Sequence, residues 1–544
     1  MRARSTFGTE LRPVRPGVRP IVWSIAGSDS GAGAGLQADL KALQAFGVHG
    51  CTAVASITAQ NSVAVTRVEP VSAELLDAQL DALAHDLPPQ AIKTGLLGSV
   101  DNVRVVCRWV DRLRARGLPV ALVVDPVLGA STGAAFADAD TLAAYRELLL
   151  PRATLVTPNG VEARRLVGDG AQALSVPELA ARLHALGAQA VAVTGGDDAQ
   201  AAPGWALDWI ATPHASGWLA LPRVDTRHTH GTGCTFATSA AAALALGFAS
   251  ADALVLAKMA TTQALRRSYA AGQGAGPVIA QAGFAAQPDL LPWMSWGDSI
   301  KENSQFDSFW RRLDKRQSPK TLKEIGLYAI VDSASRVVQV VAAGVRTVQL
   351  RVKTPDAPDA AWHVALRQSV TEALAACQAA GAILVVNDHW RLAVELGAPA
   401  VHLGQEDLLA LGEAGRAELA ATGLRLGISS HSLWELCRAR SLAPWYVACG
   451  PVWPTLTKAM PWVPQGLDNL AWWVHMAGVP VVAIGGILEP AQLTQAAQSG
   501  AAGVCVVRGL GDEPQQTVPG WQLALDQGRA VSRLPVPVLP HPSL

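Results

Sequence analysis

The sequence contains no uncharged apolar run close to the roughly 20 residues that a membrane-spanning helix needs. It also lacks a charge imbalance, because Lys plus Arg and Asp plus Glu number 44 each. Without net positive charge, we expect neither nucleic-acid nor membrane partners. Only 16% of the residues are charged and 50% are hydrophobic, which excludes a disordered protein. The composition allows a homo-oligomer but does not determine the oligomeric state.

The seven cysteines include no CxxC pair. Their odd number and their dispersion predict reduced thiols and a cytoplasmic location rather than a disulfide framework. The first 20 residues carry five Arg but no apolar segment. We therefore expect residues 1–20 to be a disordered basic leader and not a secretory signal.

At 544 residues the chain is too long for one ordinary domain. Residues 21–285 alternate buried strand-like runs with amphipathic helical runs, which predicts an α/β domain with a parallel sheet. Residues 286–323 are polar, charged and interrupted by Pro, so we interpret them as a linker. Residues 324–535 contain eight strand candidates with helix-compatible gaps, the count of a (β/α)8 TIM barrel.

Two glycine loops in the first half are candidate ligand sites. Gly31, Gly33 and Gly35 precede a helix, but their spacing matches neither the Walker A motif nor GxGxxG, so the loop is either a ligand site or a tight turn. The second loop runs from Thr229 to Cys234 and opens another helix, where backbone N–H groups would form an anion hole. The same helix terminus would favour a thiolate, although a buried cysteine without chemistry is the alternative.

Polar residues also follow predicted strands of the first half. Asp125 ends VALVVDP, and Asn159 and Glu162 lie in TPNGVEA after the next strand. Oxygen ligands at the carboxyl ends of parallel strands suit Mg²⁺ bound together with a nucleotide. Each residue alone could instead be a helix N-cap or a solvated loop residue.

The first half resembles the hydroxymethylpyrimidine/phosphomethylpyrimidine kinases of the ribokinase-like family. The resemblance is carried, in family order, by AGSDSGAGAGLQADLKA, GCTAVASITAQN, VDPV, TPNGVEA and HGTGCT. It implies an α/β/α fold and ATP-dependent phosphorylation of 4-amino-5-hydroxymethyl-2-methylpyrimidine, first to the monophosphate and then to the diphosphate.

Matching positions carry the roles that this resemblance implies. They are Gly27, Asp39 and Gln60 for the pyrimidine; Asn159, Glu162 and Asp125 for Mg-ATP and its phosphates; and Gly231, Gly233 and Cys234 for the transferring phosphoryl group. Thr194 in VTGGD is a departure, because some members have Lys there, and it leaves the ATP-phosphate contacts open.

In the second half, Gln349, Arg351 and Lys353 alternate along one expected strand and would face the same side. Asp388 and Asp407 follow two neighbouring strands and would share one Mg²⁺. A solvated acidic rim is the alternative interpretation.

Further along the second half, Thr455, Thr457 and Lys458 place two hydroxyls and an ammonium within four residues, which favours a phosphate clamp. Gly486 follows the seventh strand, where barrels often bind phosphate through backbone N–H groups. Ser429 adds a donor after the fifth strand. Taken singly, each segment is compatible with a simple turn.

This half resembles the thiamine-phosphate synthases through GLYAIVDS, QLRVK, NDHW, HLGQED, LGISSH, GPVWPTLTK, PQGL and AIGGI. The resemblance implies that hydroxymethylpyrimidine diphosphate loses diphosphate and that a thiazole phosphate then captures the pyrimidinylmethyl cation. The implied roles are Asp388 and Asp407 for Mg²⁺; Arg351, Lys353, Asn387, Lys458 and Ser429 for the diphosphate; Gln349 for the pyrimidine; and Thr455, Thr457, Gly486, Val507 and Arg508 for the thiazole phosphate. Arg508 is a departure, because many members have Ser there.

We therefore expect a bifunctional enzyme in which a kinase supplies a synthase. One alternative is another activity on the same folds, either a kinase for pyridoxine-type substrates or a thiazole tautomerase. A second alternative is that one half is a non-catalytic sensor of pyrimidine or thiamine phosphate. The presence of Cys234, Asp388 and Asp407 argues against the sensor. A DNA-binding regulator is disfavoured because no basic recognition helix is evident.

Overall fold

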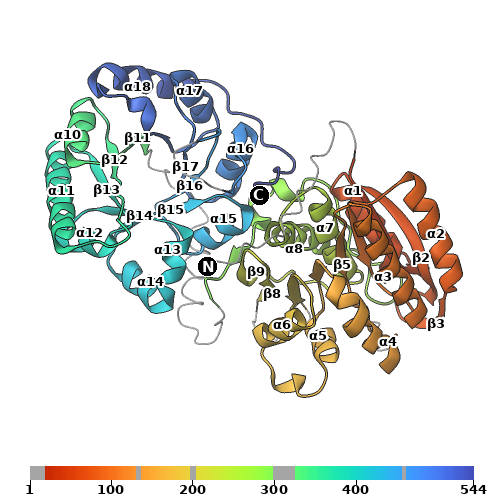
Figure 1. Cartoon of the computed structure of the whole chain (residues 1–544). Helices are drawn as coiled ribbons and strands as arrows, with labels where there is room; N and C mark the ends of the chain where they lie inside the picture. Colours follow the sequence, from red (N-terminus) through yellow and green to blue (C-terminus); the bar gives the residue numbers. More distant parts are fainter. Residues whose placement is uncertain (1–18, 130–135, 197–203, 298–324, 456–460) are drawn as a thin grey trace. The chain divides into compact units, whose positions relative to one another are not determined.

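The computed structural model describes residues 19–129, 136–196, 204–297, 325–455 and 461–544. The chain divides into two compact units, residues 1–298 and 299–544, shown in Figure 1. Ser304 and its neighbours in the predicted linker lie outside the described residues, as does most of the predicted leader. No described helix has the length and apolarity to cross a bilayer.

The first unit is built on a ten-stranded sheet in the order β10-β9-β8-β7-β6-β5-β4-β1-β2-β3. Its centre is parallel and consists of β7 Val191–Thr194, β6 Leu155–Val156, β5 Ala121–Val124, β4 Ala91–Thr94, β1 Ile21–Asp29 and β2 His49–Gln60. These are the six strands that the sequence predicts, because strands buried on both faces are uniformly apolar.

Four antiparallel strands at the two sheet edges were missed by the sequence reasoning: β3 Val65–Pro70, β8 Trp205–Ala211, β9 Ser216–Pro222 and β10 Trp293–Met294. The exposed, polar pattern of β3 explains why hydrophobicity did not mark it.

Helices cover both faces of this sheet (Figure 1). They are α1 Gly35–Ala45, α2 Ala73–Asp86, α3 Val100–Ala115, α4 Ala139–Ala144, α5 Gly160–Val167, α6 Val176–Ala185, α7 Thr232–Ala245 and α8 Ser250–Arg266. Trp23 and Ile25 on β1 pack with α2, α3, α5 and α6 in one core. The intervening Ser24 points to the other face, where its hydroxyl contacts Asp39 of α1.

The predicted linker begins too early. Two short 3-10 helices, Phe284–Ala286 and Pro288–Leu290, and strand β10 belong to the first unit. Leu290 and Leu291 are buried there, and β10 pairs with β9. Pro and polar residues on either side of these short elements hid them from the sequence reasoning.

The second unit is a closed barrel of eight parallel strands in which β18 pairs with β11, as the sequence predicts. The strands are β11 Gly326–Val331, β12 Thr347–Leu350, β13 Ile383–Asn387, β14 Ala400–Leu403, β15 Arg425–Ser430, β16 Tyr446–Cys449, β17 Val481–Ala483 and β18 Gly503–Val506.

The helices of the barrel are α10 Ala334–Ala342, α11 Ala360–Ala379, α12 Trp390–Leu396, α13 Gln405–Ala410, α14 Gly412–Ala421, α15 Leu433–Arg440, α16 Gly466–Met476, α17 Pro490–Gln498 and α18 Pro514–Ala530. Alternate strand residues fill the interior with one buried cluster that includes Tyr328, Val385, Tyr446 and Cys505. The unit also extends beyond the predicted end at residue 535, because Ser543 is buried and its carbonyl accepts from the Val463 N–H.

Candidate active sites in the two units

The two glycine loops of the first unit, which the sequence presents separately, lie against each other. A side-chain carbon added to Gly231 would lie 2.0 Å from the Gly33 carbonyl oxygen, and Gly231 has a φ of +84°. The Asp29 carboxylate at the end of β1 orders the first loop by accepting hydrogen bonds from the Gly31, Gly33 and Ala34 N–H groups at 2.8–3.0 Å. The loops therefore form one continuous wall.

Asp29 and His230 join this wall to the candidate pyrimidine residue Gln60. The His230 Nε2 atom lies 3.0 Å from an Asp29 carboxylate oxygen and 3.3 Å from the Gln60 amide nitrogen. Burial raises the pKa of Asp29, but hydrogen bonds from His230 and the loop amides outweigh it and leave the pKa below its usual value. Sequence reasoning missed Asp29 as a site residue, although it lies inside the first glycine motif.

A buried lysine on β4 is the second residue that was missed. The Lys93 ammonium is inaccessible to solvent and lies 3.1 Å from both carboxylate oxygens of Asp39 and 3.4 Å from an oxygen of Asp125. The Asp39 carboxylate also accepts hydrogen bonds from the hydroxyls of Ser24 and Thr238, at 2.6 and 2.7 Å. The Asp39 carboxylate is therefore occupied by contacts with protein side chains. It is not available for the pyrimidine contact that the sequence resemblance implied.

The surroundings of Cys234 oppose the thiolate that the helix terminus would favour. Cys234 lies in the first turn of α7, as the sequence predicts. Burial nevertheless raises the pKa of its thiol to about 12, and Asp125 and Asp39 add to this effect while Lys93 opposes it. Burial likewise raises the pKa of Asp125, which hydrogen-bonds with the thiol. The carboxylates and the burial outweigh the helix terminus, so Cys234 is a neutral thiol near pH 7.

Asn159 and Glu162 form the helix cap that the sequence left open as an alternative. The Asn159 side-chain oxygen accepts from the Val161 and Glu162 N–H groups at 3.0 and 2.9 Å, and the Glu162 carboxylate accepts from the Asn159 N–H at 3.0 Å. Asn159 also bridges to Thr194 at the end of β7. The cap therefore occupies the Asn159 side-chain oxygen and one carboxylate oxygen of Glu162.

In the second unit, Asp388 and Asp407 lie beyond the carboxyl ends of the adjacent strands β13 and β14. Both are exposed. Asp388 has a φ of +65°, unusual for a residue other than glycine, and its N–H donates to the His402 carbonyl at 3.0 Å. Asp407 accepts from the Gly404 N–H at 2.9 Å.

The two carboxylates of Asp388 and Asp407 fit a magnesium ion that binds together with the phosphate groups of a substrate. Across the described ranges, no group of three or more His, Cys, Asp or Glu side chains is placed to hold a metal ion. Mg²⁺ commonly uses one or two carboxylates together with substrate phosphate oxygens and water. Asp388 and Asp407 meet that requirement.

The predicted alternation along the second barrel strand stops early. Strand β12 ends at Leu350, so only Gln349 lies within it, buried inside the barrel. Arg351 follows the strand and is partly buried, whereas Lys353 is exposed in the next loop. Arg351 still affects a buried side chain of the barrel electrostatically. The pKa of His402 is lowered to about 4, mainly by burial and further by Arg351 and His431.

A chain of hydrogen-bonded side chains crosses the barrel interior. It runs from Asn387 through Gln349, Tyr328, Tyr446 and His402 to Ser429. Sequence reasoning named both ends and Gln349, but it missed Tyr328, Tyr446 and His402. All three lie in predicted strands, and only closure of the barrel brings them together.

The candidate thiazole-phosphate residues come from three loops at the same end of the barrel. Gly486 has a φ of +73°, and a side-chain carbon there would lie 2.6 Å from the Trp453 carbonyl oxygen, so the loops after β16 and β17 touch. Thr455 is half-buried in the first of them. Val507 and Arg508 follow β18, with Arg508 exposed at the start of a 3-10 helix, Arg508–Leu510. Thr457 and Lys458 lie outside the described residues.

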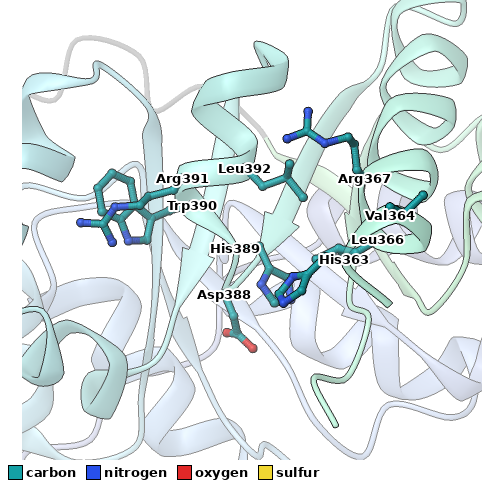
Figure 2. Close-up of a pocket in the computed structure, with 9 residues that line it drawn as sticks. All are labelled: His363, Val364, Leu366, Arg367, Asp388, His389, Trp390, Arg391 and Leu392. Carbon is teal, nitrogen blue, oxygen red and sulfur yellow. The ribbon is translucent and has the colours of Figure 1, made fainter. Parts of the chain in front are cut away.

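A cavity of about 420 Å³ opens beside Asp388. Figure 2 shows its lining from α11, α12 and the end of β13. Two of its cations are already paired: Arg367 with Glu395 at 2.7 Å, and Arg391 with a carboxylate of α14 at 2.8 Å. The cavity therefore adjoins the candidate metal site without a free guanidinium to hold an anion.

Comparison with known proteins assigns each unit to a family. Residues 29–279 match the phosphomethylpyrimidine kinase family, and residues 327–510 match the thiamine monophosphate synthase family. A hydroxymethylpyrimidine/phosphomethylpyrimidine kinase of Synechococcus elongatus is 44% identical over 262 residues, covering 48% of this chain and 96% of that protein.

Two plant relatives match this chain across both units. The chloroplastic thiamine biosynthetic bifunctional enzyme TH1 of Arabidopsis thaliana is 32% identical over 508 residues, which cover 91% of this chain and 90% of that protein. The match continues from the α/β/α unit, with its paired glycine loops, into the barrel. With both units matched in this order, the chain belongs to the bifunctional thiamine biosynthesis enzymes, with a phosphomethylpyrimidine kinase unit followed by a thiamine monophosphate synthase barrel.

Proposed function

We propose that the first unit transfers phosphoryl groups from ATP to hydroxymethylpyrimidine and its monophosphate, and that the barrel joins the resulting diphosphate to a thiazole phosphate. The observation that supports this most directly is the position of the two candidate sites. In each unit several candidate residues lie at or beyond the carboxyl ends of parallel strands, such as Asp125 and Asn159 in the first unit and Asp388 in the barrel, and each unit is the one that the family match assigns to that reaction. Ligands bind at this end in both fold classes.

In the kinase unit, Gly231 and Gly233 would offer N–H groups to the transferring phosphoryl group at the start of α7. Cys234 would act as a neutral thiol beside Asp125, because its pKa is about 12. The positive charge near the reacting oxygen would come from Lys93, which Asp39 holds in place.

The pyrimidine and the nucleotide would lie on the two sides of this loop. Gln60 and Gly27 would contact the pyrimidine, whose ring nitrogens and amino group match an amide that both donates and accepts. Glu162 and Asp125 would hold the magnesium of Mg-ATP, with Asn159 orienting Glu162 through the helix cap. Thr194 would lie near the ATP phosphates.

In the barrel, Asp388 and Asp407 would hold the Mg²⁺ that neutralises the departing diphosphate. Arg351, Lys353, Lys458 and Asn387 would donate to the same oxygens. Gln349 would face the pyrimidine. The thiazole phosphate would bind in the loops that carry Thr455, Thr457, Gly486, Val507 and Arg508.

A reconstitution assay tests the proposal. The purified chain is incubated with hydroxymethylpyrimidine, ATP, Mg²⁺ and thiazole phosphate, and thiamine phosphate is measured. Omitting the thiazole phosphate should leave hydroxymethylpyrimidine diphosphate as the end product. Pyridoxal in place of the pyrimidine tests the alternative kinase substrate. Absence of thiamine phosphate in the complete mixture contradicts the proposal, and faster turnover of pyridoxal contradicts the assigned kinase substrate.

We also propose that the protein works in a reducing compartment such as the cytoplasm. All seven cysteines are free thiols, and six of them are buried. The plant relative is named as chloroplastic, so compartment varies within the family. Localisation of the tagged protein in its own host tests this point.

A further inference from the structure

In the hydrogen-bonded chain inside the barrel, each group has a fixed role as donor or acceptor. The Gln349 end of the chain determines these roles. The Gln349 amide nitrogen donates to the Asn387 side-chain oxygen at 2.6 Å, and the Gln349 amide oxygen accepts from the Tyr328 hydroxyl at 2.9 Å. A phenol has one proton to donate. Because Tyr328 has used its proton on Gln349, its oxygen can only accept from the Tyr446 hydroxyl, which lies 2.8 Å away.

The same reasoning carries the direction through to Ser429. Tyr446 has used its proton on Tyr328, so its oxygen accepts from His402 Nδ1 at 2.9 Å, and that nitrogen must carry the imidazole proton. The ring is buried and hydrogen-bonded to hydroxyls at both nitrogens, which favours the neutral form. Nε2 then has a lone pair and accepts the Ser429 hydroxyl proton at 2.8 Å.

Tight packing holds the central members of this chain in place. The Tyr446 ring stacks on His402 at a centroid distance of 5.7 Å and meets Tyr328 edge-to-face at 5.8 Å. Gly427 on β15 makes room for it, because a side-chain carbon there would lie 2.2 Å from the Tyr446 ring. Five bonds of 2.6–2.9 Å between buried or half-buried groups thus form one network, which the packed rings prevent from rearranging singly.

We propose that Tyr328, Tyr446 and His402 are positioning residues that hold Ser429 as a hydrogen-bond acceptor toward the pyrimidine. Because its proton is committed to His402, Ser429 offers lone pairs to the site. Lone pairs suit the pyrimidine, which presents amino N–H groups and a methylene carbon that becomes positive, and they repel diphosphate oxygens. At the other end, the Asn387 oxygen is occupied by Gln349, so its NH₂ group is the part left to donate to the diphosphate.

This inference rests on the proposed synthase activity and replaces the role that the family resemblance implies for Ser429, because Ser429 would no longer donate to the departing diphosphate. The tautomer of His402 can be measured without turnover. The full chain is labelled with ¹⁵N-histidine, and the His402 signals are assigned by their loss in His402→Gln. Nitrogen NMR should then show the proton on Nδ1. A proton on Nε2 overturns the proposal.

Product inhibition distinguishes the two roles of Ser429. In Ser429→Ala, we expect synthase kcat to fall about 10- to 100-fold, while inhibition by inorganic diphosphate with Mg²⁺ stays within about twofold of wild type. A donor to diphosphate would instead weaken that inhibition by about tenfold or more, the size of a lost charge-assisted hydrogen bond, and this result overturns the proposal.

Two substitutions at His402 distinguish the loss of the hydrogen-bond acceptor for Ser429 from the loss of imidazole packing. In His402→Gln the amide oxygen can replace Nε2 as acceptor for Ser429, whereas in His402→Asn the shorter amide reaches only the Nδ1 position. We expect His402→Gln to retain more kcat than His402→Asn, with KM for both substrates little changed in each. The reverse order overturns the proposal. The unchanged KM values control for folding of the barrel, and a wild-type chain without synthase activity defeats the proposed function itself.

Discussion

The Lys93 ammonium lies 3.1 Å from both carboxylate oxygens of Asp39, with neither side chain exposed to solvent. Asp125 lies 3.4 Å from the same ammonium. Three charges therefore share a dry site between β4, α1 and the end of β5. Burial is the main reason why the pKa values of Asp125 and Cys234 are raised; neighbouring carboxylates add to the effect and the Lys93 ammonium opposes it.

Lys93→Met should destabilise the kinase unit and abolish its activity. Removing one partner of a buried ion pair leaves an uncompensated charge and typically costs about 3–5 kcal/mol. Thermal unfolding of the full chain should show a lower first transition, while synthase activity at low temperature stays unchanged. Lys93→Arg is the matched control that keeps the charge. Wild-type stability together with normal kinase activity in Lys93→Met would show that the ammonium is dispensable.

Cys234 should react slowly with iodoacetamide near pH 7 and faster only as the pH rises well above 9. The physical reason is that alkylation requires the thiolate and the pKa of this thiol is raised to about 12. It is a convenient probe, because the other six cysteines are buried. Rapid alkylation at pH 7, mapped to Cys234 by mass spectrometry, would contradict the neutral thiol.

In the matched variant Cys234→Ala, kinase turnover should fall about tenfold or more but not to zero, since the backbone donors of the loop remain. Synthase activity serves as the internal control. An unchanged kinase kcat would assign Cys234 a structural role.

The contrast between Cys234 and the strands shows what the sequence could predict. Buried parallel strands are marked by their own apolar runs, so six strands of the first sheet and all eight of the barrel were predictable. The ionisation of Cys234 depends on Asp39 and Asp125, which come from distant segments. The local sequence indicates that Cys234 lies at a helix terminus, but it does not show that these two carboxylates lie nearby.

Some residues that were missed did leave a signal. Lys93 interrupts the apolar run AIKTGLL, and a lysine within a buried strand requires carboxylate partners. Tyr328, His402 and Tyr446 gave no comparable signal, since polar aromatics in barrel strands also occur as ordinary core. Their function depends on hydrogen bonds that only the closed barrel creates.

Asp388→Gly should keep the fold and lose the condensation reaction. Asp388 has a φ of +65°, which glycine adopts at no steric cost, so stability should be unchanged or rise by up to about 1 kcal/mol. Without the carboxylate, Mg²⁺ no longer neutralises the diphosphate, and hydroxymethylpyrimidine diphosphate from the kinase should accumulate in phosphorus NMR.

Asp388→Ala is the companion variant, expected to be equally inactive but slightly less stable than Asp388→Gly. Thiamine phosphate formation at the wild-type rate and with the wild-type Mg²⁺ requirement in either variant would disprove the metal assignment.

Separate expression of residues 1–304 and 305–544 should give one active kinase and one active synthase. Each unit has its own sheet and core, and the sheet of the first unit is complete with β10, which ends at Met294. The point of division, Ser304, lies outside the described residues. Each fragment is assayed for its own reaction beside the full chain. An insoluble or inactive fragment would show that the unit depends on the rest of the chain.

The C-terminal segment should control the thiazole-phosphate site. The Asn469 side chain on α16 accepts from the His541 N–H at 2.9 Å and donates to the His541 carbonyl at 3.0 Å. The His541 ring also contacts the Gln465 carbonyl at 2.8 Å, and the Gln465 N–H donates to the Pro451 carbonyl at 2.7 Å. These bonds link the segment to the loop that carries Thr455.

Removing residues 536–544 should therefore raise the KM for thiazole phosphate several-fold, because the loop after β16 loses its outer support. Two buried hydrogen bonds at about 1 kcal/mol each correspond to a factor of roughly 10–30 at most. Kinase parameters should stay unchanged. Asn469→Ala, which breaks the same contacts without shortening the chain, should reproduce the KM effect, whereas Gln498→Ala, which loses only its bond to the Ser532 carbonyl, should not. Equal KM values in the truncated, Asn469→Ala and wild-type chains would show that the loop holds its position without the segment.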